Sequence, residues 1–181
     1  NKILDKKLEN PHTGSYNRYF KMISYRTEES LATHADRFHL NSSYSTASYS
    51  MGNIFLSQLE YIIGKENVQK GLKKYFADFS FKHPIPNDVK RSMEKVSGIH
   101  LDWYLNEWTQ TTHTIDYSVR SISNKQIILQ RHGKMPMPID VRVTYKDGTL
   151  EDFTIPLQIM RGNKPTTAKV LKDWSWSHPV Y

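Results

Sequence analysis

The chain contains no cysteine, which excludes a disulfide framework and any zinc or iron–sulfur site held by thiolates. It also lacks an apolar run long enough to cross a bilayer, because Ser57, Gln58 and Glu60 interrupt its longest hydrophobic helix. No His-Glu-x-x-His, Gly-x-Ser-x-Gly or glycine-rich phosphate loop occurs. We therefore expect no membrane span and no complete catalytic motif of these kinds.

Positively charged residues are in modest excess. Lys and Arg number 25 against 18 Asp and Glu, so the formal net charge is +7. The densest positive group, Lys70, Lys73 and Lys74, is typical of a solvated helix face. A basic surface for nucleic acid or acidic partners remains an open hypothesis. Because no nucleic-acid motif accompanies the charge, we expect no nucleic-acid partner.

The period of the apolar residues changes near residues 109–113, from a helical period before it to a strand period after it. With 38% hydrophobic and 12% aromatic residues, the chain can form one globular domain or two small ones. We predict an α+β fold: an antiparallel helical domain over residues 1–112, followed by a small antiparallel β-sandwich over residues 113–181.

Helical patterns fill the first half. A short helix is predicted to start near Ser15, and residues 25–43 have no period and are expected to form a loop. A helix that begins with Tyr49-Ser50-Met51-Gly52 is predicted to end at Gly64. Its predicted inner stripe is Phe55, Leu59, Ile62 and Ile63.

Three further helices are predicted to follow as packed neighbours, because their connections are short. Asn87 is the predicted N-cap of the second of them, which Gly98 closes. Their predicted inner faces are, in chain order, Val68, Leu72, Tyr75, Phe76 and Phe79; then Val89, Met93 and Val96; then Leu101, Tyr104, Leu105 and Trp108.

Strand patterns fill the second half. Two alternating runs, residues 139–145 and 153–159, flank Asp147-Gly148, and this combination predicts a β-hairpin. Further strands are predicted over residues 115–119, 126–131 and 169–171. Several short antiparallel strands without an intervening helix are typical of a small sandwich or half-barrel.

Eight histidines invite a search for a metal site. The closest pair is His34 and His39, whose i, i+5 spacing places the two imidazoles on different faces of a helix. In a loop the two rings could meet, but scattered surface histidines are the simpler interpretation. We expect no metal-ligating residue in this chain.

Tyr49 and Gly52 form the one constellation that suggests chemistry. On a helix they stand at i and i+3, so the glycine leaves a gap beside the tyrosine where a backbone or substrate can approach. A phenol aimed into a cleft is a neutral donor that can stabilise a developing oxyanion. A half-buried core tyrosine beside a helix-packing glycine is the alternative, and residue types alone favour it.

Four segments in this order resemble the gluzincins, the zinc aminopeptidases of the aminopeptidase N and leukotriene hydrolase type. They are ASYSMG, GKENVQKGLKKYFADF, NDVKRSMEKVSGIHLDWYLNEW and TIDYSV. The resemblance is good over residues 25–120 and loose beyond them. It implies that the helical half is the C-terminal half of a thermolysin-like catalytic domain and that the strands form the β-sandwich domain of longer members.

The resemblance also implies a catalytic role for Tyr49. In that family the matching tyrosine hydrogen-bonds the oxyanion formed when activated water attacks a peptide carbonyl. The family's zinc ligands and substrate-amine site precede this tyrosine and are absent here, and nothing supports Glu28 or Glu29 as replacements. We therefore expect zinc in the full-length protein, none bound by this segment, and no activity of the segment alone. The expected partners are a peptide substrate and the N-terminal part of the same protein.

Met51 departs from the family pattern, which has lysine at this position. The function of that ammonium group is therefore missing here. This departure supports an alternative hypothesis, a catalytically degenerate peptidase-like module that binds or scaffolds.

Overall fold

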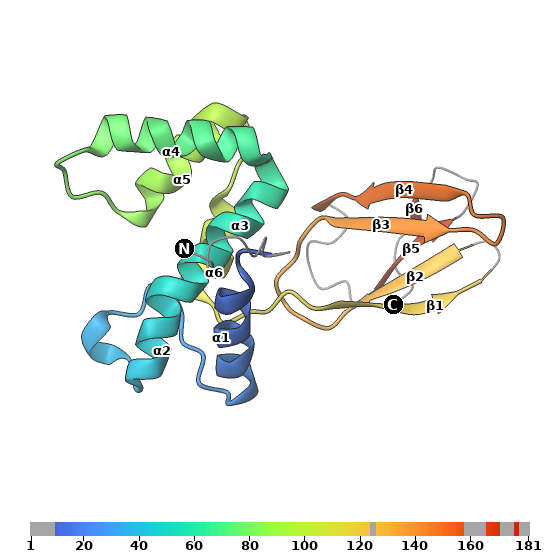
Figure 1. Ribbon diagram of the computed structural model, residues 1–181, viewed down its shortest axis with the longest axis horizontal. Helices are drawn as coiled ribbons and strands as arrows, with labels where there is room; N and C mark the ends of the chain where they lie inside the picture. Colours follow the sequence, from blue (N-terminus) through green and yellow to red (C-terminus); the bar gives the residue numbers. More distant parts are fainter. Residues whose placement is uncertain (1–9, 124–125, 158–165, 171–175, 178–181) are drawn as a thin grey trace, which may run out of the picture. The chain divides into compact units, whose positions relative to one another are not determined.

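The computed structural model describes residues 10–123, 126–157, 166–170 and 176–177. The chain divides into two compact units, Asn1–Thr112 and His113–Tyr181. The first unit consists of helices and the second of antiparallel strands (Figure 1). The predicted α+β fold class is confirmed.

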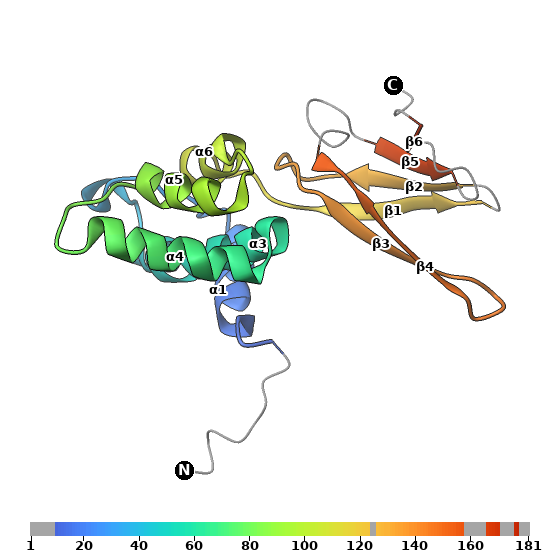
Figure 2. The ribbon, with the colours of Figure 1, turned by 90° about the horizontal axis from the view of Figure 1, so that it is seen from above.

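Helices that were predicted from apolar period account for most of the first unit. The predicted helix near Ser15 is α1, and α4 and α5 lie side by side (Figure 1 and Figure 2). Within the described ranges, no helix combines the length and apolarity that a membrane crossing requires. The elements are α1 (Thr13–Ser24), η1 (Ala35–Arg37), α2 (Asn41–Ser45), η2 (Thr46–Met51), α3 (Gly52–Ile63), α4 (Lys65–Phe79), α5 (Pro86–Ser97) and α6 (Asp102–Gln110).

The helix that carries Tyr49 begins earlier than the sequence predicted. Helical structure starts at Asn41, and η2 is a π-helical turn that joins α2 to α3. The run is unbroken, because the flanking residues Ser45 (φ −62°, ψ −42°) and Gly52 (φ −60°, ψ −40°) have α-helical dihedrals. Single π-helical turns inside α-helices are rare and frequently occur at functional sites.

The helix start was predicted wrongly because α2 has no apolar period. Its sequence is Asn-Ser-Ser-Tyr-Ser, and its buried residue is polar. Ser43 is 1% exposed, and its hydroxyl donates a hydrogen bond to the carbonyl of Thr27 at 2.8 Å. A tertiary contact with the preceding loop therefore supports this helix.

The core of the helical unit surrounds α6. Tyr104 is 1% exposed, and its hydroxyl donates to the carbonyl of Phe55 at 2.6 Å. Burial raises the pKa of Tyr104 well above its ordinary value. The predicted inner faces are confirmed for Leu59, Ile63, Val68, Met93, Leu101, Tyr104 and Trp108, which are all buried.

The start of α5 differs from the prediction in one detail. Its N-cap is Ile85 rather than Asn87, and Pro86 is the first helical residue, a position that needs no N–H donor. The Asp88 carboxylate accepts the Ile85 N–H at 2.9 Å, so an acidic side chain of the first turn, rather than Asn87, makes the side-chain hydrogen bond at this helix start. Gly98 ends the helix with φ 70°, as predicted.

Two residues of α4 do not face inward as predicted. Leu72 is 40% exposed and Phe76 is 74% exposed. The helix instead approaches α5 closely at Gly71, where a Cβ would lie 2.2 Å from the Sδ of the fully buried Met93. Because a glycine provides this contact, the packing direction of α4 cannot be read from its apolar stripe.

The strands of the second unit form two antiparallel sheets. The hairpin predicted at Asp147-Gly148 is confirmed, with Gly148 at φ 83°. The strand order is β1-β2-β5-β6 in one sheet and β3-β4 in the other. The strands are β1 (Tyr117–Ile122), β2 (Gln126–Arg131), β3 (Ile139–Thr144), β4 (Leu150–Ile155), β5 (Thr166–Val170) and β6 (Trp176–Ser177).

The two sheets share a small apolar core. Ile127 and Leu129 of β2 are buried in one cluster with Phe153 and Ile155 of β4. The β3–β4 hairpin crosses over the larger sheet (Figure 2). This sheet-on-sheet packing is that of a small sandwich. The strand predicted over residues 169–171 falls partly on β5, whereas β6 was not predicted, and Ile159 and Leu171 lie outside the described residues.

Candidate functional site

Tyr49 lies on the outer side of the π-helical turn η2. It is 74% exposed, whereas Ala47, Ser50 and Met51 of the same turn are 2%, 1% and 5% exposed. The turn packs against α1. Tyr49 is therefore not the half-buried core tyrosine of the alternative interpretation, and its phenol is accessible to a ligand.

Gly52 leaves the backbone beside Tyr49 open. It is the first residue of α3, and its N–H donates to the carbonyl of Tyr49. A Cβ at Gly52 would meet no atom of the described residues within 4 Å. Gly52 is therefore not required for packing within the described part of the chain, and another molecule can approach the helix at this point.

An apolar groove of about 490 Å³ includes Gly52 in its wall. Tyr49, Gly52 and Leu56 follow one another at i, i+3 and i+7, a spacing that keeps residues on one helix face. The groove can bury an apolar group but supplies no charge. Its walls include Phe55, Leu56, Leu72, Tyr75 and Leu105.

The paired histidines lie in the loop around η1. His34 Nδ1 accepts the N–H of Asp36 at 3.3 Å, and the N–H of His39 donates to Glu29 Oε1 at 3.0 Å. In the described ranges, no three His, Asp or Glu side chains form a group that could hold a metal ion. His34 and His39 therefore do not form such a group with the acids of this loop.

Glu28 is a partly buried acid to which the sequence assigned no role. Its Oε2 is buried and has no hydrogen-bond partner among the described residues. Burial, and then the charge of Glu28, raise the pKa of Tyr19 to about 12. No spacing rule predicts this pair, because α1 and the following loop bring the two side chains together.

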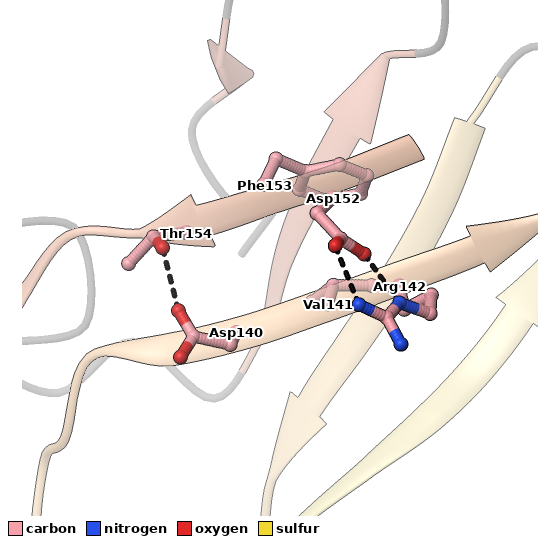
Figure 3. A pocket seen from close by; sticks show the side chains of 6 residues that line it. All are labelled: Asp140, Val141, Arg142, Asp152, Phe153 and Thr154. Carbon is pink, nitrogen blue, oxygen red and sulfur yellow. Dashed lines mark hydrogen bonds and ion pairs between the residues drawn. The ribbon is translucent and has the colours of Figure 1, made fainter. Parts of the chain in front are cut away.

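A hollow of about 590 Å³ lies on the β3–β4 hairpin (Figure 3). Arg142 donates to both carboxylate oxygens of Asp152 at 2.7 Å, and the Thr154 hydroxyl donates to Asp140 at 2.5 Å. Each pair joins residues directly opposite in the ladder. Such pairs stabilise the register of a hairpin. We assign these groups a structural role.

The Arg142–Asp152 pair predicts a pH dependence of the hairpin. Hydrogen bonding to Arg142, with a further contribution from its charge, holds the pKa of Asp152 below its usual range. Because the folded-state pKa is depressed, the pair stabilises the hairpin above the ordinary aspartate pKa, about 3.9. That contribution is lost as the pH falls through the lowered pKa.

The measurement is an NMR titration of the Asp152 carboxyl carbon. We expect its midpoint to lie lower in the natural chain than in an Arg142→Ala variant. Equal midpoints would show that the pair does not act on Asp152 in solution.

Comparison with known proteins relates the helical unit to one family. The sequence model of the Peptidase family M1 domain matches residues 6–108. Glutamyl aminopeptidase of Rattus norvegicus is 32% identical over 92 residues, which cover 51% of this chain and 9% of that protein. The Homo sapiens glutamyl aminopeptidase is 28% identical over 92 residues, with the same coverage of 51% and 9%. The chain thus spans 9% of the length of these curated relatives.

Among solved structures, the crystal structure of Legionella pneumophila aminopeptidase A in complex with aspartic acid aligns with a TM-score of 0.49. The two sequences are 15% identical, and the alignment covers 80% of this chain and 17% of that chain.

Proposed function

The chain belongs to the M1 family of peptidases, and from this membership we propose that it is the C-terminal segment of a zinc-dependent aminopeptidase that removes N-terminal residues from peptides. In this proposal, residues 1–112 are the helical part of the thermolysin-like catalytic domain. Residues 113–181 are the β-sandwich domain that follows it. The remaining partner is the N-terminal part of the same protein.

One observation carries the proposal, the exposure of Tyr49. This tyrosine matches the tyrosine of the gluzincins, and it is 74% exposed on a turn whose other large side chain, Met51, is buried. A phenol donates a hydrogen bond without carrying charge, so it can stabilise the negative charge that develops on a peptide carbonyl oxygen. The catalytic contribution of this chain is that one hydrogen bond, from the Tyr49 hydroxyl to the oxyanion.

Zinc belongs to the full-length protein in this proposal. The described residues offer no group of three metal-binding side chains, and the contribution proposed for this chain is Tyr49 and the walls around it. The segment alone is expected to hydrolyse nothing.

The test compares the full-length protein with the isolated segment. We expect the full-length protein to hydrolyse aminoacyl-p-nitroanilides, to lose this activity on treatment with a chelator and to regain it on addition of zinc. The segment of residues 1–181 should show no turnover under the same conditions. An isolated segment that cleaved these substrates at an appreciable rate would overturn the proposal.

The burial of Met51 supports a second candidate function, that of a catalytically degenerate binding or scaffold module. Met51 is 5% exposed, and a lysine in the same place would have to bury its charge, which is costly without a partner. The position therefore serves packing in this protein. A full-length protein that binds zinc but turns over no aminoacyl-nitroanilide would support a catalytically degenerate binding or scaffold module.

A further inference from the structure

The π-helical turn η2 is held from one side by α1. Ala47, Ser50 and Met51 of the turn are buried, and α1 is the element that packs along η2. Ser50 contributes no compensating bond, because its buried hydroxyl has no hydrogen-bond partner among the described residues. A rare backbone geometry needs support from its surroundings. That support has to come from contacts beside the turn.

Asn53 provides the polar contact nearest to the turn. It lies in the first turn of α3, directly after Gly52, and both ends of its amide bind the start of α1. Its Oδ1 lies 3.0 Å from His12 Nδ1, and its Nδ2 donates to the Ser15 hydroxyl at 2.8 Å. Because an amide oxygen can only accept, this contact is a hydrogen bond in the tautomer of His12 that carries its hydrogen on Nδ1.

A second side-chain bond joins the same two helices farther from the turn. Gln58 Nε2 donates to the Tyr16 hydroxyl at 2.7 Å. It joins α1 to α3 as Asn53 does, but more than one helical turn farther along α3. The structure thus contains a matched pair of contacts, one adjacent to the segment of Tyr49 and one remote from it.

We infer that Asn53 is a positioning residue for Tyr49: by binding α1 through both ends of its amide, it fixes the helix where the π-helical turn ends. This inference rests on the proposed function and deepens it. Tyr49 is itself 74% exposed, and no hydrogen bond of its hydroxyl is found among the described residues, so within the described part of the chain the backbone of the turn is what sets the position and direction from which its side chain projects. A displacement of about 1 Å at a reacting group can lower a rate by about a hundredfold.

The experiment measures kcat and KM in the full-length protein for Asn53→Ala, Gln58→Ala, Tyr49→Phe and the double variant Asn53→Ala/Tyr49→Phe. We expect Asn53→Ala to lower kcat about tenfold with little change in KM. In the Tyr49→Phe background the same substitution should change kcat by less than about twofold, because the group that it positions is gone. Gln58→Ala should lower the Tm by a similar amount but leave kcat nearly unchanged. Ser15→Ala removes one of the two hydrogen bonds of the Asn53 amide and is the milder variant if Asn53→Ala folds poorly. It should also lower kcat, but by less.

Three results would overturn the inference. An equal loss of kcat from Asn53→Ala in both backgrounds would show that Asn53 acts by another route. Equal effects of Asn53→Ala and Gln58→Ala on kcat would show that general packing of α1 on α3 is responsible. No effect of Asn53→Ala or Ser15→Ala, while Tyr49→Phe is impaired, would reject the role of Asn53 alone. An unimpaired Tyr49→Phe would reject the proposed role of Tyr49 itself, and the single variant reports this separately.

Discussion

Replacement of Tyr49 by phenylalanine should lower kcat of the full-length protein by about 10²–10³, because the variant loses one hydrogen-bond donor to the oxyanion. KM should change little, since the ring remains and the bond forms with the transition state. The fold should be unaffected, because Tyr49 is 74% exposed and substitutions at such positions usually change stability by less than about 0.5 kcal/mol. Steady-state kinetics with an aminoacyl-p-nitroanilide, together with the Tm, measure these quantities.

Tyr44 offers a matched control on the same helical run. It is 43% exposed, and its ring meets Phe38 edge-on with centroids 5.5 Å apart, a contact that Tyr44→Phe preserves. We expect that variant to keep its turnover. Unchanged kcat in Tyr49→Phe, or equal losses of kcat in Tyr49→Phe and Tyr44→Phe, would show that the Tyr49 hydroxyl has no specific catalytic role.

Replacement of Gly133 by alanine should destabilise the β unit by about 3 kcal/mol, at the upper end of the usual cost of overpacking. An added Cβ would lie 2.0 Å from the carbonyl oxygen of Thr114 and 2.7 Å from the N of Asp116. Both atoms are backbone atoms and cannot rotate away. Hydrogen bonds fix the segment, because the N–H of Gly133 donates to Asp116 O at 3.1 Å and that of Met135 to Thr114 O at 3.2 Å.

Hydrogen exchange followed by mass spectrometry is the suitable measurement, because the chain has two units and a single Tm need not describe both. Peptides from β1 and β2 should lose protection in Gly133→Ala, while peptides from α4 and α5 serve as an internal reference. Lys134→Ala, a change at the exposed neighbouring residue, should leave protection as it is. Retained protection of β1 and β2 in Gly133→Ala would contradict the prediction.

The pattern of apolar residues was sufficient to predict an element wherever its buried residues recur with the period of a helix or a strand. The inner face of α6 and the β3–β4 hairpin were predicted because Leu101, Tyr104 and Trp108 follow the helical period and Asp147-Gly148 marks the turn. Pattern failed for α4, since an apolar stripe shows which residues avoid water but not which neighbour covers them. Leu72 and Phe76 therefore stay partly or largely exposed, and Gly71 makes the close contact with α5.

For the candidate site too, some features follow from the sequence and others only from the tertiary structure. The sequence by itself determined the α+β class and the family, and it singled out Tyr49, because these depend on residue types and their order. The tertiary structure decided that Tyr49 stands on a π-helical turn with its ring exposed and that Asn53 ties the adjacent turn to α1. Neither follows from the sequence of α2, η2 and α3, because contacts with α1, distant in the chain, determine which side of this helix is buried.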